Sequence, residues 1–208
     1  MEAEATIDFL LNLCSRQVTD EAELTGKHIA NWRQQNQLAV LQLAKGMIEQ
    51  AQIRIKKIPV KTLAAFLNYC SYEEEPSLQN KWATLLVNLV NNDHPSQVSY
   101  LFVELLNQLS PLEGAVLDYV YRESFLLDEA ENPYFKRLEL IQYCQHTFHT
   151  TYEDNQLIVE NLLRLRLMEE KPATLIKSED TEDLQLVYSD QLRLSKLGVQ
   201  LLSVCIEY

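Results

Sequence analysis

Residues 71–86 read SYEEEPSLQNKWATLL, a stretch that passes from acidic and polar residues into an apolar helix face. Two helix starts fit its first half. Ser71 and Glu74 have the spacing of a capping box, whereas Pro76 suits the first turn of a helix that starts at Glu75. The sequence leaves both starts open. A run of glutamates favours either one, because a helix N-terminus carries partial positive charge.

The second half of this stretch predicts a core helix. Its large apolar side chains recur at steps of three and four, as on one face of an α-helix: Leu78, Trp82, Leu85 and Leu89. Leu86 is expected in the core beside them. Residues 91–95, Asn-Asn-Asp-His-Pro, are expected to end the helix, because Asn and Asp favour turns and Pro cannot continue a helix.

The composition predicts a mainly helical protein. The chain has 208 residues, only four glycines and a formal net charge of −12. Sheets and loops need more turn glycine than this. Residues 110–208 contain nine basic and eighteen acidic residues. This excess of negative charge opposes contact with nucleic acid phosphates. No apolar run reaches the roughly 18 residues of a membrane span, and the acidic start does not resemble a signal peptide, so a cytoplasmic location is expected.

Three helices are expected before the deciding stretch, over residues 2–18, over about 25–54, and from near Pro59. Trp32 lies on the apolar stripe of the long helix and is expected in the core. Asn36 falls on the same stripe. A buried Asn needs hydrogen-bond partners and can fix the register between helices, whereas an Asn at the edge of the stripe has no such role. Both interpretations stay open.

The most basic local cluster is formed by Arg54, Lys56, Lys57 and Lys61. One interpretation is a solvated helix end, because cations suit the C-terminal end of a helix dipole. The other is a binding surface for a partner or an anionic membrane, with Arg54, Lys56 and Lys57 as its candidate residues.

The acidic run of Glu73, Glu74 and Glu75 also has two interpretations. Carboxylates at a helix start are favoured by the dipole and are usually solvated, which leaves them available to bind a partner. Adjacent carboxylates can also serve acid–base catalysis. We expect partner binding.

A second domain is expected from Ser110, because Ser-Pro-x-Glu is a strong helix-start signal. Residues 1–109 are then a helical bundle and residues 110–208 a winged-helix-like domain. Further helices are expected at about 135–148 and 152–167.

The hydrophobic period then changes to that of strands. Residues 167–171 and 184–188 are predicted to pair as one small β-hairpin, with the acidic residues 178–183 at its tip. A last helix through Leu197 follows. Three helices, a hairpin and a closing helix is the order of a winged helix-turn-helix.

No motif predicts a reaction or a cofactor. The chain has no glycine-rich phosphate loop, no nucleophile elbow and no HExxH. His146 and His149 lie beside Cys144 with the spacing of a metal pair, but no further ligands match, and a pair at a helix end is expected instead. The four scattered cysteines are expected to stay reduced.

Several segments resemble the signature block of the Abi-alpha family. These are IPVK at 58–61, CSYEEEPSLQ at 70–79, KWATLLVN at 81–88, LLNQLSPL at 105–112 and LSKLG at 194–198. The similarity covers about residues 25–207. The chain departs from the family pattern at Tyr72, where Leu is common, and at Lys196, where Pro is common. The resemblance implies a bacterial protein associated with abortive infection and phage resistance. It supplies no catalytic residues.

We therefore predict a non-enzymatic cytoplasmic protein that acts in phage defence by binding a protein partner. The alternative is a winged-helix transcription regulator. An acidic recognition helix and an acidic wing make contact with DNA unfavourable without excluding it. A third interpretation is an enzyme built on Glu73 and Glu74. Association into a homo-oligomer is left open.

Overall fold

The computed structural model describes residues 24–93, 100–126, 133–177 and 184–206. The chain forms two units, one of residues 1–111 with 203–208 and one of residues 112–202. The expected boundary lay between residues 109 and 110, and residues 203–208 were expected in the second domain. They group with the first unit, where the Asn88 side-chain amide donates to the Val204 carbonyl at 3.0 Å. The helix expected over residues 2–18 lies outside the described residues.

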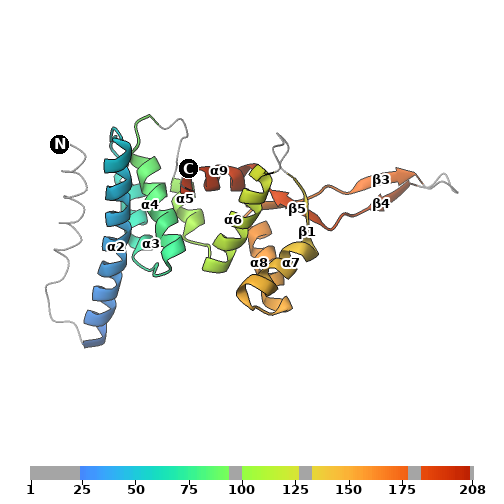
Figure 1. The fold of residues 1–208 in the computed structure, drawn as a ribbon, viewed down its shortest axis with the longest axis horizontal. Helices are drawn as coiled ribbons and strands as arrows, with labels where there is room; N and C mark the ends of the chain where they lie inside the picture. The colour runs from blue at the N-terminus through green and yellow to red at the C-terminus, as the bar shows by residue number, and fades with distance from the viewer. Residues whose placement is uncertain (1–23, 94–99, 127–132, 178–183, 207–208) are drawn as a thin grey trace. The chain divides into compact units, whose positions relative to one another are not determined.

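The first unit is helical (Figure 1). Its described helices are α2 (Leu24–Ala51), α3 (Val60–Cys70), α4 (Pro76–Val90) and α5 (Tyr100–Leu106). α2 packs along α4, and α3 packs against α5. None of the described helices is both long and apolar enough to cross a membrane.

The start of α4 uses the proline and not the capping box. Pro76 is the first helical residue and Glu75 is the N-cap. Pro suits this position because its missing N–H would have had no partner there. The Ser71 hydroxyl is already engaged, since it donates to the Asn68 carbonyl at 2.6 Å and accepts from the Arg33 side chain.

The core of this unit forms around α4. Trp82, Leu85 and Leu86 are buried, and the Trp82 ring meets the Phe66 ring edge-on with centroids 5.4 Å apart. Trp32, which was expected in the core, is half-buried. Its indole N–H needs an acceptor and donates to the Glu74 carboxylate at 3.1 Å.

Asn36 is buried, as the register interpretation requires. Its side-chain amide donates to the Ser71 carbonyl at 3.1 Å. Ser71 is the C-cap of α3, where the last carbonyls have no helical partners. Asn36 therefore joins α2 to the end of α3.

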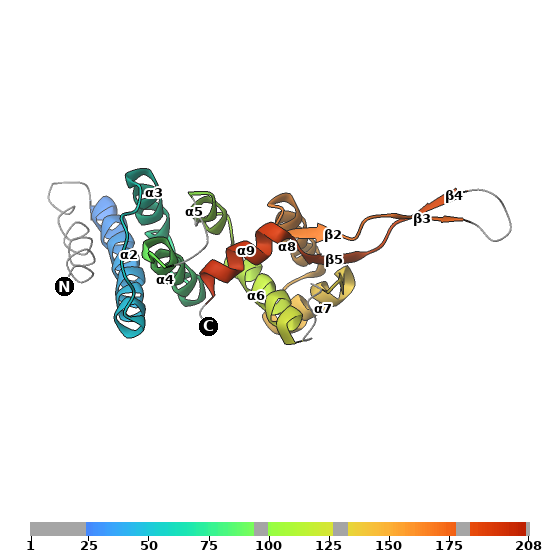
Figure 2. The same cartoon turned by 90° about the horizontal axis from the view of Figure 1, so that it is seen from above.

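The second unit combines helices with short antiparallel strands. Its helices are α6 (Pro111–Leu126), α7 (Arg137–Phe148), α8 (Tyr152–Arg164) and most of α9 (Lys196–Cys205). Its strands are β1 (Phe135–Lys136), β2 (Met168–Glu170), β3 (Thr174–Lys177), β4 (Leu184–Val187) and β5 (Gln191–Leu194). β5 lies between β1 and β2 in a three-stranded sheet, while β3 and β4 form a separate ribbon. Figure 2 shows this ribbon extending away from α7 and α8.

The predicted single hairpin is wrong in its pairing. β2 pairs with β5, which places Met168 opposite Leu194, and both side chains are buried. β4 pairs instead with β3, and its Leu186 and Val187 are exposed. Burial of Met168 and Leu194 favours the pairing of β2 with β5, because both apolar side chains are then removed from water. The expected acidic tip, residues 178–183, lies outside the described residues.

A tight junction joins α8, β2 and α9. Arg166 follows α8 with φ 57°, and the amides of Arg166 and Leu167 donate to the carbonyls of Leu163 and Leu162, as in a Schellman motif. Gly198 of α9 then lies so close to Leu167 that a Cβ at this position would be 2.1 Å from its carbonyl oxygen. No side chain fits there, so this glycine is required for the close approach of helix and strand.

Candidate functional site

The acidic run lies in the turn between α3 and α4, and this turn is held against α2. The Arg33 side chain donates to the Ser71 hydroxyl at 2.9 Å and to the Asn68 amide oxygen at 3.0 Å. The Trp32 indole reaches Glu74 from the next position of the same helix. The turn is therefore fixed by side chains from more than 30 positions earlier in the sequence.

An aromatic side chain completes this group. The Arg33 guanidinium lies 4.3 Å from the centre of the Tyr72 ring, and the Trp32 ring meets Tyr72 edge-on at 6.4 Å. We call these residues the Arg33 cluster: Trp32, Arg33, Asn68, Ser71, Tyr72 and Glu74. Every acceptor of Arg33 in the cluster is neutral, and stacking on Tyr72 adds a cation–π contact.

The three candidate glutamates differ in their surroundings. Glu73 is half-buried, and burial raises the pKa of its carboxyl group, while its carboxylate accepts from the Glu75 amide at 3.0 Å. Glu74 is bonded to Trp32. Glu75 is the exposed N-cap of α4. Of the three, Glu75 is the residue best placed to meet a partner.

The basic candidates lie at the opposite end of α4. Arg54 forms a bidentate pair with Asp93, with N–O distances of 2.7 and 3.1 Å, and this pair raises the pKa of Arg54. The Lys56 amide donates to the carbonyl of Val90, the last residue of α4. Lys57 is exposed. The structure therefore keeps the basic and acidic candidates apart.

A further surface, missed by the sequence analysis, lies on α8. Thr151 caps this helix by accepting from the Asp154 amide at 3.2 Å. We call the outward side of α8 the α8 face: Tyr152, Glu153, Gln156, Leu157 and Glu160. Leu157 lies between two glutamates on this face and is 69% exposed.

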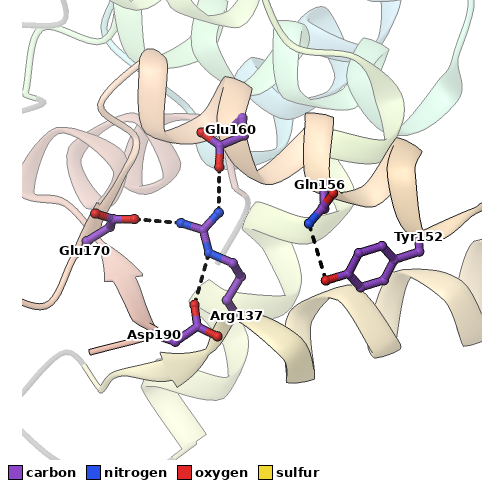
Figure 3. A network of polar contacts seen from close by, with 6 residues as sticks. All are labelled: Arg137, Tyr152, Gln156, Glu160, Glu170 and Asp190. Atoms are coloured by element: carbon purple, nitrogen blue, oxygen red, sulfur yellow. Dashed lines mark hydrogen bonds and ion pairs between the residues drawn. The ribbon is translucent and has the colours of Figure 1, made fainter. Parts of the chain in front are cut away.

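Arg137 holds the α8 face against its neighbours (Figure 3). Its guanidinium contacts three carboxylates, Glu160 at 2.7 Å, Glu170 at 2.6 Å and Asp190 at 3.2 Å. These acids come from α8, β2 and the turn before β5, whereas Arg137 is the first residue of α7. We call this group the Arg137 cluster.

The Arg137 cluster carries more negative than positive charge. One guanidinium faces three carboxylates, and each of those acids is more than half exposed while Arg137 is only 20% exposed. Exposed carboxylate oxygens remain able to accept hydrogen bonds from a bound cation. The α8 face is therefore an acidic surface with an apolar side chain at its centre.

The remaining sequence candidates do not converge. His146 and His149 are exposed, and His149 ends α7 in the left-handed conformation. Among the residues that the structure describes, no three His, Cys, Asp or Glu side chains are grouped to hold a metal ion. Cys70, Cys144 and Cys205 are buried thiols, and burial raises the pKa of Cys144 to about 11.

Comparison with known protein families gives a match over most of the chain. The model of the family described as abortive infection alpha matches residues 33–205. No curated protein and no solved structure matches the chain.

Proposed function

Because the chain belongs to the abortive infection alpha family, we propose that it is a non-enzymatic phage-defence protein of the cytoplasm that acts by binding another protein. The family description supports the association with abortive infection. The α8 face supports protein binding as the mode of action. Glu75 and Lys57 are further candidate contacts in the first unit.

The order of elements in the second unit supports a winged-helix interpretation. Helix α6 is followed by β1, α7, α8, β2, the β3–β4 ribbon and β5. A winged helix-turn-helix has this order of helices and strands. The second helix of its helix-turn-helix pair, the recognition helix, lies in the major groove of DNA. By this interpretation α8 is the recognition helix and the ribbon is the wing.

The chemistry of the α8 face is the observation that carries the proposal. A helix that binds DNA needs Lys and Arg to neutralise phosphates. The α8 face instead carries Glu153 and Glu160, with the exposed Leu157 between them. Charged groups that flank an apolar centre are typical of a protein interface. The α8 face therefore favours a protein ligand over a duplex.

The proposal is tested by phage plating on cells that express the chain. Leu157→Lys removes the apolar centre of the α8 face without changing the core, and we expect it to abolish the reduction in plaque number. Leu101→Lys is the matched control, because Leu101 is 49% exposed on α5. Full protection by the Leu157→Lys variant would contradict a role for the α8 face.

A DNA-binding regulator is the second candidate, favoured by the element order alone. A salt titration of binding to a mixed-sequence duplex separates the two functions. Regulators hold DNA through many phosphate contacts, so their affinity is measurable at physiological salt and falls steeply as salt rises. We expect no binding at physiological salt. Retained affinity with a steep salt slope would favour the regulator.

A further inference from the structure

The first unit carries a surface that complements the α8 face. Val60, the first residue of α3, is 82% exposed. Lys57 and Lys61 lie on either side of it in the sequence, and both are exposed. We call these three residues the Val60 surface. It combines an exposed apolar side chain with two cations, whereas the α8 face combines Leu157 with two carboxylates.

The chain lengths allow the charges on the two surfaces to reach a similar spacing. Glu153 and Glu160 are seven positions apart on one helix, which separates them by about 10 Å along its axis. Four residues of chain from Lys57 to Lys61 span at most about 13 Å. The long Lys side chains can adjust to this difference, so both ion pairs can form while the apolar side chains meet.

One charged residue of each surface is held by a contact within its own unit. The Lys61 ammonium lies 4.6 Å from the centre of the Tyr100 ring. Glu160 is held by Arg137 at 2.7 Å. Ordered side chains lose little further freedom on binding, which favours association.

We propose that this chain associates head to tail, with the Val60 surface of one copy bound to the α8 face of the next. This inference rests on the proposed protein-binding role of the α8 face and names a second copy as its occupant. The contact joins two different surfaces, so it is heterologous, and repeated contacts build rings or filaments. The basic candidate Lys57 then serves as a contact residue.

Sedimentation of the full chain at increasing concentration tests the proposal. An ionic strength of about 0.15 M is suitable, because repulsion between the acidic copies is then screened beyond about 8 Å. We expect the average mass to rise with concentration, and to rise less at about 1 M salt, where the ion pairs of the contact are also screened. A monomer at every concentration would overturn the proposal.

Two variants test the pairing of the surfaces. Leu157→Lys places a cation on the α8 face and repels the Val60 surface, whereas Val60→Glu places a carboxylate on the Val60 surface and repels the α8 face. We expect each variant alone to be monomeric and the Leu101→Lys control to associate like the natural chain. An equimolar mixture should associate again, because each variant offers the surface that the other lacks.

The mixture also excludes misfolding, because an unfolded variant cannot restore association. A mixture that stays monomeric would overturn the head-to-tail contact. If the natural chain is monomeric and Leu157→Lys still loses phage protection, the α8 face binds a different protein and only the self-association is wrong. If association follows the prediction but Leu157→Lys still protects, the proposed function fails and the self-association stands.

Discussion

The Arg33 and Arg137 clusters use the same side chain in opposite ways. Arg33 binds a hydroxyl, an amide oxygen and an aromatic ring, all of them neutral. Arg137 binds three carboxylates from three separate elements. Loss of Arg33 would leave an exposed Asn68 amide and a Ser71 hydroxyl that keeps its bond to the Asn68 carbonyl, whereas loss of Arg137 would leave three acids repelling one another. Arg33 joins α2 to the end of α3. Arg137 joins three elements to α7 and also neutralises part of their negative charge.

The largest effect is expected from Arg137→Met. The variant keeps an apolar stem but leaves Glu160, Glu170 and Asp190 without their shared cation. Breaking a fully buried ion pair costs about 3–5 kcal/mol, and the exposure of these acids reduces the cost here to about 2 kcal/mol. Urea unfolding at pH 7 measures it. The cost should shrink at about 1 M salt, where exposed charges are screened beyond about 3 Å, and an equal cost at low and high salt would contradict the charge-based account.

A smaller effect is expected from Arg33→Met. It removes two hydrogen bonds to neutral acceptors and the contact with Tyr72. We expect a cost of about 1 kcal/mol, because the exposed Asn68 amide can bond water and the Ser71 hydroxyl keeps its bond to the Asn68 carbonyl. The same urea experiment measures the difference from the natural chain. A cost above that of Arg137→Met would reverse the comparison.

Removal of one acid from the Arg137 cluster should have a still smaller effect. In Glu170→Gln the guanidinium keeps Glu160 and Asp190, and the variant also relieves repulsion among the acids. We expect a change below about 1 kcal/mol, as for exposed ion pairs. A double-mutant cycle with Arg137→Met measures the coupling between the two residues. A coupling larger than the cost of Arg137→Met itself would show that a single pair dominates the cluster.

The smallest effect is expected from Glu73→Gln, beside the Arg33 cluster. Burial raises the pKa of Glu73 in the folded state, so folding favours its protonated form. This contribution is present below the unfolded-state pKa and is lost as the pH rises through the folded-state pKa. Thermal unfolding should therefore show the glutamine variant equal to or slightly above the natural chain at pH 7. A clear advantage for the natural chain at pH 7 would contradict a burial-dominated carboxyl group.

The period of apolar residues predicted the core of α4 well, because a helix places positions three and four apart on one side. The same period did not show that Trp32 is only half-buried, since it records apolar spacing but not the need of the indole N–H for an acceptor. The α8 face could have been found from Leu157, an apolar residue outside the buried stripe of Ile158 and Leu162. The Arg137 cluster could not, because its acids lie 23 to 53 positions away in the chain.

The sequence by itself determined the helical character of the chain, the proline start of α4 as one of two options, and the family. Each depends on residues close together in the sequence, where backbone preference and helical spacing act. Only the tertiary structure decided which strand pairs with β2, how the Asn36 amide is satisfied, and which carboxylates surround Arg137. These depend on burial and charge between distant segments, whose approach the whole packed unit determines.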